Sequence, residues 1–285
     1  MKNIWRCINM SKKKKFKKLA ESNIQVLKSG KLKIAKGQKI NLKPFVNESI
    51  QNTVVSRLDA IISKEDVVIE TSDLRVDITS NMTSDIKTAE LASRVNSPNV
   101  NTVVVTVNKK DALDIFDFLD DSSLGIILRT STLASIYSGG DVKKKWVDLN
   151  KDDNSTFTNV MFVPNIIIFI DPETGKIRKV PYNINLLIVA VPTVKKMTDG
   201  VEEVSDEDAV ARIIADISDS AIRCGAKNII LNPYNYKLFK KDPHITAELW
   251  KEISTSQRFI EQFKSFIFAI ENEELFIIFN AKRNS

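Results

Sequence analysis

The strongest structural signal in this sequence is an amphipathic helix over residues 206–224, which lies between two apolar runs. Ser205 is suited to cap its amino terminus, and Gly225 marks its end. The apolar runs over 184–191 and 228–231 are typical of strands that are covered on both faces. The apolar residues of this helix recur at three- and four-residue spacing, which predicts that they form a single buried stripe. These residues are Val210, Ile213, Ile214, Ile217 and Ala221.

The same alternation of strands and helices continues along the chain, and it predicts a three-layer α/β/α fold around a mixed central sheet. We expect a basic, flexible tail over residues 1–17 and a single domain over residues 18–285. The expected helices cover residues 12–29 and 243–253, besides 206–224. The expected strands cover 66–78, 103–105, 124–128, a hairpin over 165–180, then 265–270 and 275–279.

The positive charge of this chain is concentrated at its amino terminus. The net charge is +6, yet residues 1–45 hold 14 lysines and arginines against one acid, Glu21. This run is either a solvated helix face or a nucleic-acid contact that acts by counterion release. No interleaved aromatic platform accompanies this run, which disfavours a specific single-strand binder. The nucleic-acid alternative rests on Lys12, Lys13, Lys14, Lys15, Lys17 and Lys18.

Composition excludes several classes of protein. Two cysteines and one histidine exclude a disulfide scaffold and a zinc cluster, and they fit a reducing cytosol. We expect Cys224 to be a core residue and His244 a surface one. No apolar run approaches the roughly 18–20 residues of a membrane span, so we expect no membrane partner.

Five segments, taken in order, resemble the microbial-type poly(ADP-ribose) glycohydrolases, whose core is macro-domain-like. Arg129–Leu133 is similar to the R-x-S-T-L segment of that family. Leu231–Pro243 aligns without a gap on the pattern L-G-A-W-G-C-G-V-F-x-N-D-P. The helix over 19–30, the strand over 162–169 and the Pro-containing strand end over 188–193 occupy matching places. The resemblance implies a macro-domain-like fold.

The resemblance also implies a Gly-rich loop and a Gln-Glu-Glu segment before R-x-S-T-L, which cradle the ligand and supply acids. Here the strand expected over 124–128 runs directly into Arg129, so both parts are missing from the alignment. Asp117, Asp120 and Asp121 precede that strand, which would put them at the opposite end of the sheet. We therefore expect no catalytic residue and no enzymatic activity.

The phosphate loop of the family is also altered. Its three glycines are replaced by Asn232, Asn235 and Lys237, and Thr193 stands where an asparagine is usual. Asparagine tolerates the left-handed backbone that such a turn needs, but Lys237 and the bulk of Tyr234 and Tyr236 would fill the space for phosphates. Lys237 could instead offer its charge to a phosphate.

These observations favour a non-catalytic interaction or structural module without a cofactor or metal, which binds a protein partner or assembles with itself. Three alternatives stay open. The first is an ADP-ribose or nucleotide binder without hydrolysis, which uses Asn232, Asn235, Lys237 and Thr193. The second is a nucleic-acid-binding protein that acts through residues 1–45. The third is an active glycohydrolase whose acids have moved.

Overall fold

The structure is a computed structural model of the 285-residue chain. It describes residues 2–34, 37–58, 75–80, 102–109, 117–118, 122–138, 140–151, 157–192, 205–270 and 272–284. Side chains are described over these ranges except at 2–11, 75–80, 109 and 283–284. Among the described helices, none combines the length and the apolar character needed to cross a membrane.

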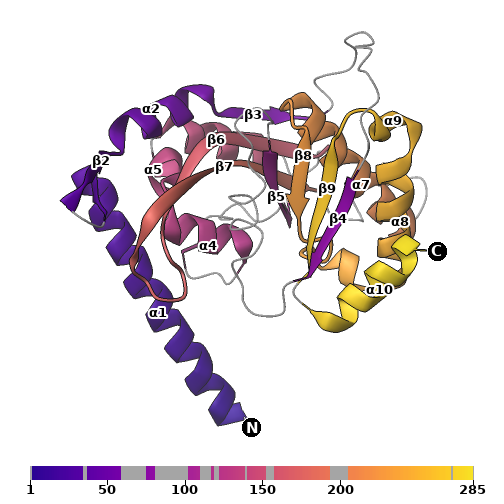
Figure 1. Cartoon of the computed structure of the whole chain (residues 1–285), viewed down its shortest axis with the longest axis horizontal. Coiled ribbons are helices and arrows are strands. Elements are labelled where there is room, and N and C mark those ends of the chain that lie inside the picture. Colours follow the sequence, from indigo (N-terminus) through magenta and orange to yellow (C-terminus); the bar gives the residue numbers. More distant parts are fainter. Residues whose placement is uncertain are drawn as a thin grey trace. The chain divides into compact units, whose positions relative to one another are not determined.

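The chain folds as two compact units. Unit 1 comprises residues 1–53, 114–144 and 163–184, and unit 2 comprises residues 54–113, 145–162 and 185–285. The boundary predicted at residue 17 falls inside a helix, since α1 runs without a break from Lys2 to Ser29. Figure 1 shows α1 as a single long helix in indigo.

Unit 2 is built on a seven-stranded mixed sheet with the order β3-β6-β7-β5-β8-β9-β4. β5 pairs in parallel with both β7 and β8, and β9 pairs in parallel with β8 and β4, whereas β3 and β6 are antiparallel. The strands are β3 (Val54–Arg57), β4 (Arg75–Ser80), β5 (Thr102–Lys109), β6 (Asn159–Ile170), β7 (Ile177–Val191), β8 (Asn228–Leu231) and β9 (Ser265–Ile270). The far halves of β6 and β7 belong to unit 1.

Both faces of the central strands are buried, which explains why their sequences are apolar throughout. In β5, Val103 and Val105 face a core that α7 and α8 cover, while Val104 lies on the other face and is equally buried. The helices of unit 2 are the second part of α6 (Asp141–Asn150), α7 (Asp206–Arg223), α8 (Pro243–Thr255), α9 (Gln257–Ile260) and α10 (Glu273–Asn284), with a 3-10 turn η3 (Leu238–Lys240).

The predicted helix over 206–224 is confirmed as α7. Ser205 caps it, since its side chain accepts a hydrogen bond from the Asp208 amide at 3.1 Å. Three acidic residues in the first turn stabilise the helix, because their negative charge lies near the positive end of the helix dipole. Gly225 follows with a positive φ of 69°, a left-handed conformation that favours glycine.

Unit 1 has its own small core beneath a two-stranded ribbon. Leu19 of α1, Leu32 of the ribbon and Leu42 meet Ile167 and Phe169 of the distal hairpin. The elements of this unit are α1, β1 (Lys31–Lys33), β2 (Lys39–Asn41), α2 (Lys43–Asn52), α4 (Ser123–Thr130), α5 (Leu133–Ser138) and the start of α6.

Two predicted strands are helices in the structure. Residues 124–128 lie in α4, where Ser122 caps the helix by accepting from the Gly125 amide at 3.1 Å. Residues 275–279 lie in α10, which begins where the Asn272 side chain accepts from the Leu275 amide at 3.0 Å. Short apolar runs fit either element, and in both places a capping side chain accompanies the helix.

The mixed α/β architecture with a helix-flanked sheet is confirmed. The predicted hairpin is confirmed as β6 and β7, joined by a turn in which Gly175 has a φ of 68°. The expected strand over 66–78 is described only from residue 75, where it forms β4.

Candidate functional site

The parallel strands of unit 2 direct their carboxyl ends to one edge of the sheet, where open α/β sheets bind ligands. β5 and β7 pair up to their carboxyl ends, where Lys109 is opposite Val191. β8 leaves the sheet earlier, since Ile230 pairs with Val104 and Leu231 is its last residue. The upper four residues of β5 therefore extend about 13 Å beyond the end of β8. The loop that follows β8 starts beside this upper part of β5.

Two buried polar atoms in the upper part of β5 have no hydrogen-bond partner among the described residues, namely the Thr106 hydroxyl and the Asn108 side-chain amide nitrogen. Thr106 is only 2% exposed, and its hydroxyl is buried and unpaired. Asn108, two residues further on, has a buried side-chain amide nitrogen that donates to nothing. Successive alternate residues of a strand share a face, so both polar groups lie on the same face of β5.

The neighbours of these two groups on β7 are apolar. Thr106 pairs with Ile188 and Asn108 pairs with Ala190, and both partners are fully buried. A buried polar group without a partner costs about 1–3 kcal/mol, so native proteins seldom keep one without a reason. Neither atom is accessible to solvent, so a ligand that hydrogen-bonds to this face would have to displace the protein atoms that cover it. The sequence carried a signal for it, namely two polar residues at alternate positions of an apolar strand.

The loop after β8 holds the predicted phosphate-binding residues Asn232, Asn235 and Lys237. The Asn232 side chain accepts from the Tyr234 amide at 2.9 Å, and the Asn235 amide donates to the Asn232 carbonyl at 3.1 Å. Neither asparagine has a positive φ; outside glycine, the described residues show one only at Asn165. The left-handed turn allowed by the sequence is therefore not used, because a side-chain turn at Asn232 replaces it.

Tyr234 and Tyr236, which we expected to fill the space for phosphates, are both buried in the core of unit 2. Tyr234 is 1% exposed and packs edge-on against Phe279 of α10, while its hydroxyl donates to the Pro243 carbonyl at 3.1 Å. Tyr236 packs edge-on against Phe239. Both rings belong to the main core of unit 2, which is rich in aromatic residues.

Lys237, in contrast, projects into solvent. The backbone amides of Lys237 and Leu238 open the η3 turn and donate to no acceptor among the described residues. Successive amides of this kind, next to an ammonium group, are suited to an anion. Thr193, the fourth predicted ligand residue, lies outside the described residues, whereas Pro192 before it is buried.

The R-x-S-T-L segment forms a buried joint in unit 1. Asn23 of α1 is fully buried, and its side-chain amide donates to the Leu128 carbonyl at 2.8 Å and the Ser131 carbonyl at 3.1 Å. Arg129 is 1% exposed, donates to the Phe118 carbonyl at 2.7 Å and lies over the Phe16 ring at 3.9 Å. The segment thus holds α1, α4 and the end of the preceding connection together.

The helical character of α4 changes the placement of the aspartates near it. The strand that precedes these aspartates is β5, so the connection over 110–122 leaves from the carboxyl end of β5 rather than from the opposite end of the sheet. This connection contains five aspartates, Asp111, Asp114, Asp117, Asp120 and Asp121, and no glycine. The described part is Asp117–Phe118 and Ser122, and Asp117 is exposed.

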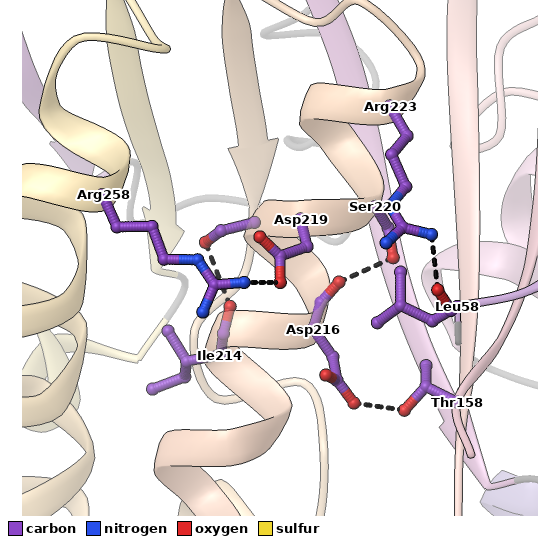
Figure 2. Close-up of polar contacts among 9 residues, drawn as sticks. Leu58, Thr158, Ile214, Asp216, Asp219, Ser220, Arg223 and Arg258 are labelled. Atoms are coloured by element: carbon purple, nitrogen blue, oxygen red, sulfur yellow. Dashed lines mark hydrogen bonds and ion pairs between the residues drawn. The ribbon is translucent and has the colours of Figure 1, made fainter. Parts of the chain in front are cut away.

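A second polar cluster of unit 2 lies on the carboxyl-terminal half of α7. Figure 2 shows Asp219 directed toward Arg258, at 2.5 Å, and Asp216 directed toward the Thr158 hydroxyl, also at 2.5 Å. Arg223, one turn further on, donates to the Leu58 carbonyl. Burial raises the pKa of the Asp216 carboxyl, although the Thr158 hydrogen bond opposes this rise, and burial also raises the pKa of Asp219.

This cluster is at the wrong edge for a ligand site. α7 begins after β7 and ends before β8, so its last turns lie toward the amino ends of the parallel strands. Its side chains tie α7 to the segments that flank β3 and β6, which is a structural task. No described group of three or more acidic, cysteine or histidine side chains is arranged to hold a metal ion.

The remaining predicted residues are placed as follows. Lys12, Lys13, Lys14, Lys15, Lys17 and Lys18 all lie on α1 and are exposed. His244 is exposed at the start of α8, where the Asp242 side chain accepts from its backbone amide at 3.0 Å. Cys224 is partly buried, and burial raises the pKa of its thiol to about 12. The predicted protein partner and cytosolic location stay predictions.

Solved structures of poly(ADP-ribose) glycohydrolases share this fold. The enzyme of Thermomonospora curvata superposes with a TM-score of 0.67 at 15% identity, over 96% of this chain and 99% of that one. The same enzyme bound to the inhibitor ADP-HPD gives 0.65 at 16% identity, over the same shares of both chains. The enzyme of Deinococcus radiodurans in complex with ADP-ribose gives 0.59 at 13% identity, over 85% of this chain and 97% of that one. No family model and no curated protein matches the sequence.

The macro-domain-like fold implied by the resemblance is therefore confirmed. The expectation that the chain is not an enzyme is overturned, because these neighbours are glycohydrolases that match nearly end to end. That expectation depended on a strand over 124–128 with no room before Arg129. Since α4 replaces that strand, residues 110–122 separate the core strand β5 from a helix along the chain.

Proposed function

We propose that this chain binds an ADP-ribosyl group at the carboxyl edge of β5, β7 and β8 and hydrolyses its glycosidic bond. The observation that carries the proposal is the unpaired pair of polar groups on β5, Thr106 and Asn108. They lie on the edge where the fold favours a ligand, and their neighbours are apolar. The ligand class follows from the fold neighbours, which include a glycohydrolase in complex with ADP-ribose.

The loop after β8 supports the binding of the diphosphate. The exposed Lys237 ammonium and the amides of Lys237 and Leu238 supply positive charge and donors. Tyr234 and Tyr236 pack into the core of unit 2, whereas Lys237 is exposed. In this assignment Lys237 binds phosphate, while Thr106 and Asn108 hydrogen-bond to the polar groups of the nucleoside.

The aspartate-rich connection supports the hydrolytic step. Glycoside hydrolysis needs one carboxyl group to protonate the leaving oxygen and one carboxylate to assist a water molecule that attacks the sugar carbon. The bond between that carbon and the leaving oxygen breaks, the water oxygen takes its place, and the leaving group departs as an alcohol. Asp111 is the aspartate that follows the end of β5 most closely in the sequence, and we assign it the proton-donor role.

The test combines a turnover assay with a binding assay on the purified full chain. Incubation with poly(ADP-ribose) should release free ADP-ribose, measured by chromatography, and Asp111→Asn should lower the rate about 100-fold. Asp148→Asn is the matched control, since Asp148 is an exposed partner of Lys151 on α6, and it should leave the rate unchanged.

Titration calorimetry with ADP-ribose separates binding from turnover. Lys237→Ala should weaken binding about tenfold, the effect of losing one charge-assisted contact. Absence of binding to the wild-type chain would refute the site itself. Binding without release of ADP-ribose would refute the hydrolytic step alone.

A further inference from the structure

The ribbon of unit 1 places lysines of like charge directly opposite one another. Lys33 of β1 pairs with Lys39 of β2, and Lys31 is two residues from Lys33 on the same face. Leu32 points the other way and is fully buried, so this alternation turns the three lysines to solvent. Like charges directly opposite each other destabilise a ribbon. None of the three lysines forms an ion pair with a described carboxylate.

The helix that leads into this ribbon repeats the arrangement. Lys13 and Lys17, and likewise Lys14 and Lys18, are four residues apart on α1 and exposed. Such pairs are neighbours about 6 Å apart along the axis, and each pair of like charges costs a few tenths of a kcal/mol. At 100° per residue these four lysines occupy one side of the helix, while Leu19 lies on the other and is buried.

Both elements belong to unit 1, and they adjoin in the chain. α1 ends at Ser29, and the Gly30 carbonyl accepts from the Leu42 amide at 2.9 Å, which closes the ribbon onto the end of the helix. Gly30 has a φ of 63°, and an added Cβ would meet the Lys43 side chain at 2.9 Å. The turn therefore fixes how the ribbon follows the helix.

We infer that this basic surface, Lys13, Lys14, Lys17 and Lys18 of α1 with Lys31, Lys33 and Lys39 of the ribbon, binds the phosphate backbone of duplex DNA. A row of closely spaced phosphates relieves repulsion between neighbouring lysines and releases counterions, which supplies affinity without sequence selectivity. A helix and a two-stranded ribbon are both shapes that a DNA groove accommodates. This inference is independent of the proposed hydrolase.

A duplex is favoured over a single strand because, among the described side chains, no exposed aromatic ring lies between the lysines of this surface. Single-strand binders combine positive charge with aromatic rings that stack on bases. Phe16, the ring among the α1 lysines, is partly buried and lies under the Arg129 guanidinium at 3.9 Å. Lysine is also a point charge that suits phosphate contact rather than the bidentate reading of bases.

The experiment measures the anisotropy of a fluorescent 20-base-pair duplex titrated with the full chain at several salt concentrations. The ribbon variant carries Lys31→Thr, Lys33→Thr and Lys39→Thr, since threonine suits a strand. The helix variant carries Lys13→Gln, Lys14→Gln, Lys17→Gln and Lys18→Gln, since glutamine suits a helix. The control, which removes as many charges as the ribbon variant, carries Lys145→Gln, Lys251→Gln and Lys264→Gln in unit 2.

The wild-type chain should bind with a Kd of 10⁻⁴ M or tighter, roughly the range of non-specific binding. The ribbon and helix variants should each bind at least about tenfold more weakly, and the slope of log K against log salt should fall by about 0.9 per contacting lysine. The control should bind within about twofold of wild type. Circular dichroism melting checks folding, and removal of like-charge pairs should not lower the melting temperature.

Several results would overturn the inference. Equal weakening by the control would reduce the effect to net charge. Tighter binding of a single strand or of poly(ADP-ribose) than of the duplex would point to another polymer. Equal competition by polyglutamate would point to an acidic protein surface. A salt slope that the ribbon variant does not change would remove the ribbon from the contact.

Discussion

The substitution of Thr106 by valine separates stability from ligand binding on a single strand. Thr106 lies near the carboxyl end of β5, 2% exposed, and its hydroxyl has no partner. Thr102 lies at the other end of the same strand, equally buried, and its hydroxyl accepts from the Asn228 side chain at 3.1 Å. Thr102→Val is therefore a matched control with the same chemical change and a different hydrogen-bond situation.

The expected magnitudes follow from that difference. Valine keeps the β-branched shape of threonine, and Thr106→Val removes a desolvated hydroxyl while it adds a buried methyl group, so it should stabilise the fold by about 1–2 kcal/mol. Thr102→Val leaves the Asn228 amide without that acceptor and should destabilise the fold by about 1–3 kcal/mol. The two variants should thus differ by about 2–5 kcal/mol in the free energy of unfolding.

Urea unfolding followed by circular dichroism measures this difference, and calorimetry with ADP-ribose measures binding in the same samples. Thr106→Val should weaken binding about tenfold or more although it is the more stable variant, and Thr102→Val should bind as the wild type does. The reasoning is refuted if Thr106→Val is no more stable than Thr102→Val. It is equally refuted if both variants bind ADP-ribose alike, because the unpaired hydroxyl would then have no ligand to meet.

Three further predictions concern other parts of the chain. Asn23→Ala should lower the free energy of unfolding in urea by about 2–4 kcal/mol, since two buried carbonyls at the α1–α4 joint lose their donor. The exposed Gln25→Ala on the same helix should change it by less than about 0.5 kcal/mol. Equal effects of the two variants would contradict the role of Asn23. Asp216→Asn should raise the melting temperature at pH 7. Burial raises the pKa of the Asp216 carboxyl above its ordinary value of 3.8, so the folded state loses stability as the pH rises from 3.8 through the raised pKa. The advantage should vanish below pH 3.8, where the unfolded chain is protonated as well, and a gain that is independent of pH would exclude this cause. In a Cys7→Ser background, Cys224 should react with a disulfide reagent at pH 8 about 1000-fold more slowly in the folded protein than in urea. The reason is that its pKa of about 12 in the folded protein leaves little thiolate at this pH. Comparable rates would show that the thiol is accessible and ionised.

The sequence predicted those parts of the fold in which local chemistry and apolar spacing agree. α7 has a capping serine, a regular apolar stripe and a terminal glycine, and each was readable before the structure. The β6–β7 hairpin likewise has turn residues between two apolar strands. The alternation of strands and helices indicated an α/β fold, and the resemblance of five segments in order indicated the fold shared with the glycohydrolases.

The candidate site was predicted only in part. Lys237 could be chosen from sequence because the segment around it aligns with a phosphate loop. The sequence shows Thr106 and Asn108 at alternate positions of an apolar strand. Only the structure shows that their polar atoms are unpaired, because an unpaired buried group differs from a satisfied one only in what surrounds it. Tyr234 and Tyr236 illustrate the reverse case, since two bulky rings that seemed to block the site belong to the core.

By itself the sequence determined which residues avoid water and where α7 begins and ends, because these depend on neighbours along the chain. Tertiary structure alone decided whether residues 124–128 and 275–279 are strand or helix, since five apolar residues satisfy either pattern. That decision also fixed from which edge of the sheet the aspartate-rich connection leaves. The physical reason is that backbone hydrogen bonds must be satisfied everywhere, and which partner satisfies them depends on segments that are distant in sequence.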